Sequence, residues 1–191
     1  LGPTGYGDSP YQPFSTFAGN PYFIDLESLI DDKLLTKEEC ESFHWGGSER
    51  YVDYGSMYNS RYPVLRKAFE RFVPDESYEE FCSREEHWLE DYCLFMAIKN
   101  NQNGALWTTW DEKLRTRDEA ALEQKKVELK KEIDFYYFLQ YEFDKQWRKV
   151  KKYANKKGIK IIGDLPIYVA LDSADAWSNP KLFQMDEECL P

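Results

Sequence analysis

The sequence predicts an α/β protein, and three consecutive features toward its C-terminal end indicate this. Residues 132–157 repeat apolar side chains every three or four positions, which is the spacing of an amphipathic helix. Gly158 follows as a C-terminal cap, and the β-branched run at residues 159–162 is typical of a strand. A long helix that leads through a glycine into such a strand forms half of a β-α-β unit.

The opening 23 residues predict a long ordered loop. They contain four glycines, four prolines and six aromatic residues. Four prolines exclude a regular helix and remove hydrogen-bond donors from any strand, whereas a disordered tail would be poor in aromatic rings. Long ordered loops usually carry function. The chain also begins without methionine, from which we expect it to be part of a longer protein.

Between this loop and the predicted strand, the spacing of apolar residues and capping patterns predict further helices. Two of them have only a spacing pattern, at residues 24–32 and 118–131. Two have capping boxes: one helix is capped by Thr36 and Glu39, and another runs from Ser83 and Glu86 to about Lys99. The last covers residues 58–72, with a start near Pro63. Trp107 and Trp110 lie in a short irregular segment. They either fill a gap between helices or form a surface platform for a sugar.

The composition is that of a globular protein that does not bind nucleic acid. The formal net charge is −10, so a polyanionic partner would be repelled. No apolar run reaches the roughly 18–20 residues of a membrane span. The basic residues at 145–160 alternate with apolar ones at helical spacing, which favours a solvated helix face. Aromatic residues make up 17% of the chain, and with a negative charge they suit a sugar ligand better than a base.

The cysteines favour free thiols in a reducing cytoplasm over a metal site. They are scattered, without the paired spacing of zinc ligands, and only two histidines could join them. We therefore expect a cytoplasmic protein without zinc. The four cysteines are Cys40, Cys82, Cys93 and Cys189.

Two carboxylates stand out as candidate functional groups. Asp164 follows the predicted strand, and polar residues at the carboxyl ends of parallel strands form active sites. It could equally cap a turn before Pro166. Asp8 lies in the opening loop, where an Asx turn is the alternative. Carboxylates and many rings suit glycoside chemistry, although retention needs two carboxyl groups about 5 Å apart, which sequence spacing cannot establish.

Long segments of the chain resemble the 4-α-glucanotransferases, the amylomaltase or disproportionating-enzyme branch of the α-amylase clan. The first segment reads GPTGYGDSPYQPFSTFAGNPYFIDL, and another reads FDKQWRKVKKYANKKGIKIIGDLPIYVALDSADAW. Together the similar segments cover the whole chain. They are residues 2–26, 87–110, 143–177 and 179–188.

The resemblance implies part of a (β/α)8 (TIM) barrel with an inserted, mainly helical subdomain. Residues 1–23 would form a barrel segment and the substrate-cleft loop after the first strand. Residues 24–117 would form the helical insert, and residues 118–191 the barrel helices, the third strand and its following loop. The remainder of the barrel would be absent. The family transfers α-1,4-glucan segments between malto-oligosaccharides or glucans with retention of configuration, and it needs no cofactor or metal.

Carried over residue by residue, the resemblance assigns sugar contacts to this chain. Asp164 matches an aspartate that supports the subsite of the cleaved glucose. Ser9 and Tyr11 match loop residues that contact sugar near the scissile bond. Tyr6 matches a tyrosine linked to a second, more remote glucan site in some members.

The resemblance assigns no catalytic residue within the chain. The nucleophilic aspartate, the acid/base glutamate and a third aspartate would lie beyond Pro191, while Asp172 and Asp175 are typical of turn or helix-capping positions. We therefore expect the chain alone to be inactive and poorly folded, because a partial barrel leaves open strand edges. Two alternatives stay open. One is a non-catalytic glucan-binding fragment, and the other is a glucan hydrolase of the same clan, which Tyr168, Val169 and the opening loop disfavour.

Overall fold

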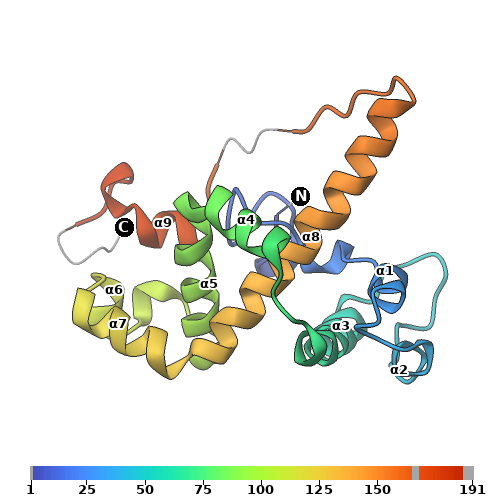
Figure 1. Ribbon diagram of the computed structural model, residues 1–191. Helices are drawn as coiled ribbons and strands as arrows, with labels where there is room; N and C mark the ends of the chain where they lie inside the picture. Colours follow the sequence, from blue (N-terminus) through green and yellow to red (C-terminus); the bar gives the residue numbers. More distant parts are fainter. Residues whose placement is uncertain (1, 165–167, 187–191) are drawn as a thin grey trace. The chain divides into compact units, whose positions relative to one another are not determined.

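The computed structural model describes residues 2–164 and 168–186, and these residues are mainly helical (Figure 1). They contain no β-strand. The α-helices are α1 (Leu26–Asp31), α2 (Lys37–Glu41), α3 (Tyr54–Arg71), α4 (Glu76–Arg84), α5 (Glu86–Asn101), α6 (Glu112–Arg115), α7 (Glu119–Glu128), α8 (Lys130–Lys156) and α9 (Ala174–Ser178). Short 3-10 helices are η1 (Tyr6–Asp8), η2 (Pro21–Phe23), η3 (Trp107–Thr109) and η4 (Pro180–Leu182).

The chain divides into two compact units. The first unit comprises residues 1–19, 82–137 and 164–191, and the second comprises residues 20–81 and 138–163. The division expected from the resemblance, into residues 1–23, 24–117 and 118–191, concerns a barrel and its insert and stays a prediction.

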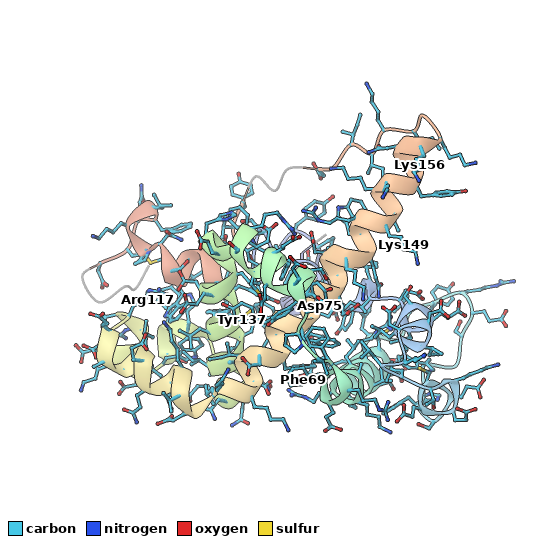
Figure 2. All side chains as sticks on the ribbon, viewed as in Figure 1. Phe69, Asp75, Arg117, Tyr137, Lys149 and Lys156 are labelled. Atoms are coloured by element: carbon cyan, nitrogen blue, oxygen red, sulfur yellow. The ribbon has the colours of Figure 1, made fainter. Side chains whose placement is uncertain are left out.

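An aromatic cluster forms the core of the first unit. Helix α5 packs against α9, and the Phe95 ring lies 5.4 Å from Trp110 and 5.8 Å from Trp177 between ring centroids. Trp177 is fully buried, and its indole N–H donates to the Leu114 carbonyl at 2.9 Å. The Arg117 guanidinium, labelled in Figure 2, lies 4.3 Å from the centroid of the same indole. The cluster therefore joins α5, α6 and α9.

The two tryptophans of the irregular segment belong to this core. Trp107 is fully buried, and Trp110 is 4% exposed. The indole N–H of Trp107 donates to the Leu171 carbonyl at 2.6 Å, and that of Trp110 donates to Ala105 at 3.2 Å. Packing between helices is thus confirmed for both, and neither forms a surface platform.

The second unit has a separate aromatic core on α3 and α8. Phe138 and Tyr141 of α8 lie 5.0 and 5.7 Å from the ring centroid of Phe72, which follows α3. Phe69 of α3 contacts Phe138 at 5.7 Å. These contacts bury one face of α8, as the amphipathic pattern of the helix predicts.

Several helix predictions are confirmed. Helix α8 follows the predicted residues 132–157 closely, and Gly158 ends it with a φ of 76°, a left-handed conformation that glycine adopts without strain. The capping box of α2 is also present. The Glu39 N–H donates to Thr36 Oγ1 at 3.3 Å, and the Thr36 N–H donates to Glu39 Oε2 at 3.0 Å.

Two predicted helix starts are wrong. Helix α3 begins at Tyr54 and contains Pro63, because Asp53 caps an earlier start by accepting the Ser56 N–H at 3.0 Å. Ser83 does not cap a helix, since it lies within α4. In both places the observed helix begins upstream of the local start signal and runs through it.

The strand expected at residues 159–162 is not formed. Ile159 is 59% exposed, Ile161 41% and Ile162 92%. A strand needs a neighbour that pairs its backbone N–H and C=O groups. Because the described residues provide no such neighbour, the segment remains irregular. The α/β class is therefore not seen in the part of the chain that the structure describes.

The cysteines that the structure describes are not joined in disulfides. Cys40, Cys82 and Cys93 form no disulfide, and burial raises the pKa of Cys93 well above its ordinary value, which keeps this thiol protonated and unreactive. Cys189 lies outside the described residues. Within residues 2–164 and 168–186, no helix is both long and apolar enough to cross a membrane.

Candidate functional site

The opening loop closes on itself at a narrow neck. Thr4 and Pro13 form an antiparallel bridge, and the Phe14 N–H donates to the Pro3 carbonyl at 2.9 Å. Residues 4–13 therefore form a closed loop, which fits the stiffness that its prolines predict.

Local hydrogen bonds hold the first half of the loop in a tight turn. Gly7 and Asp8 both adopt left-handed backbone angles, with φ of 63° and 52°. The Thr4 hydroxyl donates to Asp8 Oδ1 at 3.0 Å. The Asp8 carboxylate thus shapes the turn, although its partner is a hydroxyl four residues earlier and not the downstream backbone N–H of the expected Asx turn.

Ser9 and Tyr11 lie together beyond this turn. Ser9 Oγ accepts the Tyr11 N–H at 3.3 Å, and the Ser9 carbonyl accepts the Gln12 N–H at 3.3 Å. The Tyr11 side chain is 69% exposed. An exposed tyrosine on a stiff loop offers an apolar face and a hydroxyl, which is what a sugar ring needs for stacking and hydrogen bonding. Tyr6 begins η1, and its side chain lies outside the described part of the structure.

The base of the loop is tied to the start of α9. The Ala174 N–H donates to the Phe14 carbonyl at 2.8 Å. Thr16 donates twice to one carboxylate, from its N–H to Asp175 Oδ2 at 3.0 Å and from its hydroxyl to Asp175 Oδ1 at 2.8 Å. The first unit thus brings together the opening loop and the segment after Asp164. Asp175 is not a cap of α9, because Ser173 fills that position.

A buried lysine supports the same arrangement. Lys99 of α5 is 5% exposed, and its ammonium donates to Asp172 Oδ2 at 2.6 Å. The ammonium also donates to the carbonyls of Gly104 and Ala105, and it lies 5.2 Å from the ring centroid of Phe14. A buried charge with this many partners is compensated and fixes its surroundings. Sequence reasoning missed Lys99, although a lysine after a buried apolar run was a usable signal.

Asp164 is exposed, and its role stays a prediction. Among the described residues no hydrogen bond or ion pair joins it to Ser9 or Tyr11. The alternative turn at Pro166 lies outside the described residues. In the same described ranges, no three His, Cys, Asp or Glu side chains cluster as a metal site would require.

The loop neck gives a testable prediction, because Gly2 has no room for a side chain. A Cβ there would lie 2.6 Å from Pro13 Cβ and 2.8 Å from the Ser15 carbonyl oxygen. The Pro13 ring and the Ser15 carbonyl are both fixed to the backbone and cannot rotate away. We therefore expect Gly2→Ala to open the neck and to lower the free energy of unfolding by about 1–3 kcal/mol. Limited proteolysis should cut the loop faster. Gly47→Ala is the control, because its Cβ would meet no atom within 4 Å. Equal cleavage rates in both variants would contradict the expectation.

The sequence is similar to those of a known protein family over nearly its whole length. The sequence matches the family described as 4-alpha-glucanotransferase over residues 1–189. The 4-alpha-glucanotransferase of Clostridium butyricum is 49% identical over 192 residues, which cover 100% of this chain and 39% of that protein. The enzyme of Thermus thermophilus is 47% identical, with 100% and 38% covered.

The fold also matches that of a solved structure. The amylomaltase from Streptococcus agalactiae in complex with acarbose superposes with a TM-score of 0.95 at 39% identity, covering 100% of this chain and 39% of that one. The chain thus spans about two-fifths of the length of the relatives that it matches.

Proposed function

Since the chain belongs to the 4-alpha-glucanotransferase family, we propose that the full-length protein transfers α-1,4-glucan segments to the 4-hydroxyl of an acceptor glucose or glucan. The observation that carries this proposal is the match over residues 1–189, which runs through the opening loop and the segment after Asp164. The acarbose bound to the Streptococcus agalactiae amylomaltase supports a glucan-like ligand.

The proposed reaction is a retaining double displacement. A carboxylate attacks the anomeric carbon while a carboxylic acid protonates the leaving glycosidic oxygen, which departs with the shortened donor. The 4-hydroxyl of an acceptor sugar then displaces the carboxylate and gives up its proton to the same acid/base group. We place both groups in a (β/α)8 barrel, in the part of the relatives' length beyond Pro191. We propose no cofactor or metal for this reaction and a cytoplasmic location for the protein.

The opening loop is proposed as one wall of the acceptor site. Transfer exceeds hydrolysis only where an acceptor sugar displaces water from the reacting carbon. The exposed ring of Tyr11 and the adjacent Ser9, on a loop closed at its neck, suit that task. Asp164 is proposed to support the subsite of the cleaved glucose.

Product analysis with maltotriose tests the function. We expect the full-length protein to release glucose and to form oligosaccharides longer than maltotriose, because each transfer lengthens an acceptor. Products shorter than maltotriose alone would indicate hydrolysis, and binding without conversion would indicate the non-catalytic alternative.

The chain of 191 residues serves as a second sample in the same assay. We expect it to release no glucose, because the proposed nucleophile and acid/base lie outside it. Release of glucose by the purified chain would contradict this placement.

A further inference from the structure

The contact between Thr16 and Asp175 is built differently from the other bonds of the opening loop. Both oxygens of one carboxylate accept from one residue, at 3.0 Å from its N–H and 2.8 Å from its hydroxyl. Bonds to a charged acceptor are stronger than neutral ones, and a bidentate pair also fixes orientation. The two residues are 159 positions apart, so this contact joins distant segments of the first unit.

Phe14 connects this contact to the part of the loop that carries Ser9 and Tyr11. Its carbonyl accepts the Ala174 N–H at 2.8 Å, beside the bonds of Thr16 to Asp175. Its own N–H donates to Pro3 at 2.9 Å and closes the loop neck. The bonds of Phe14 to Ala174 and of Thr16 to Asp175 together form what we call the anchor, so Phe14 takes part in both the anchor and the neck. The anchor and the neck therefore share the backbone of Phe14.

A second charged contact, between Lys99 and Asp172, lies beside the anchor. Lys99 lies against the Phe14 ring and pairs with Asp172, three residues before Asp175. Asp172 Oδ1 is buried without a hydrogen-bond partner among the described residues. Asp172 Oδ2 thus bonds to Lys99, whereas the Thr16 N–H and hydroxyl donate to Asp175. The bonds of Thr16 thus depend on Asp175.

From these contacts we propose that Thr16 and Asp175 are positioning residues that hold the opening loop closed on the acceptor side of the glucan site. This rests on the proposed function. Water and the acceptor hydroxyl compete for the same glycosyl intermediate, so a loosened loop admits more water. In the proposed reaction, cleavage of the donor depends on the nucleophile and the acid/base, which we place outside this chain. The anchor therefore sets the ratio of transfer to hydrolysis more than the total rate of cleavage.

The test uses the full-length protein with maltotriose and measures the fraction of cleavage events that end in hydrolysis. Thr16→Val removes the hydroxyl donor and keeps the N–H and the side-chain shape, whereas Asp175→Asn removes the charge. We expect the hydrolysed fraction to rise at least threefold in both variants. Thr16→Ser keeps the hydroxyl, so its hydrolysed fraction should equal that of the wild-type protein. The control is Thr116→Val, since the Thr116 hydroxyl makes a local hydrogen bond, to the Glu112 carbonyl at 2.8 Å.

A double variant adds a readout that general destabilisation would not reproduce. If Thr16 and Asp175 act through one contact, the double variant should hydrolyse no more than the stronger single variant. An unchanged fraction in Thr16→Val, or full additivity in the double variant, overturns the inference while the proposed function stands. Should Asp175→Asn not fold, Thr16→Val decides alone. A wild-type protein that transfers no glucan overturns the proposed function itself and the inference with it.

Discussion

Trp177→Ala is expected to destabilise the first unit by about 3–5 kcal/mol, the range for removing a fully buried large aromatic side chain. The Trp177 indole touches Phe95, Trp110 and Arg117, and its N–H donates to Leu114. Its removal leaves a cavity among α5, α6 and α9, and it leaves the Leu114 carbonyl without that donor. Thermal unfolding of the full-length protein should show a clear fall in the midpoint of the transition.

Trp177→Phe is the matched control for this prediction. It keeps most of the ring volume and loses the hydrogen bond to Leu114, so we expect a smaller loss, of about 1–3 kcal/mol. A midpoint that does not change in Trp177→Ala would show that the cluster contributes little to stability.

Tyr11→Ala is expected to lower the rate of glucan transfer by tenfold or more while leaving the unfolding midpoint unchanged. The side chain is 69% exposed, so the folded protein loses little when it is removed. The proposed site, however, loses a stacking face for the acceptor sugar. A loss of about 1.4 kcal/mol in binding the transition state already lowers the rate tenfold. The initial rate of formation of products longer than maltotriose measures the effect.

Two variants make the Tyr11 result specific. Tyr11→Phe keeps the ring and removes the hydroxyl, so it should retain more activity than Tyr11→Ala if stacking dominates. Tyr153→Ala removes an exposed tyrosine on α8, where the side chain is 67% exposed, and should leave transfer unchanged. Transfer by Tyr11→Ala at the wild-type rate would remove Tyr11 from the acceptor site.

The helices that could be predicted are those whose signals are local. Helix α8 has a long amphipathic pattern and a glycine stop, and its predicted and observed bounds nearly coincide. The capping box at Thr36 and Glu39 lies within one turn, so the sequence alone specified it. The strand at residues 159–162 could not be judged locally, because a strand depends on pairing with another segment.

The candidate site also has one part that could be predicted from the sequence and one part that could not. Composition alone singled out the opening loop, and the resemblance pointed to Ser9 and Tyr11. The anchor between Thr16 and Asp175 joins positions that nothing in a single sequence relates. From its place in the loop after Asp164, the sequence predicts a turn or capping role for Asp175, whereas in the fold its carboxylate binds the base of the opening loop.

The most direct measurement of the central claim is a structure of the full-length protein with acarbose or a malto-oligosaccharide bound. The account predicts a sugar ring in contact with the Tyr11 side chain and a sugar hydroxyl within hydrogen-bond distance of Ser9 Oγ, with Thr16 still bonded to Asp175. A glucan bound in the cleft that leaves both Ser9 and Tyr11 without contact would contradict it.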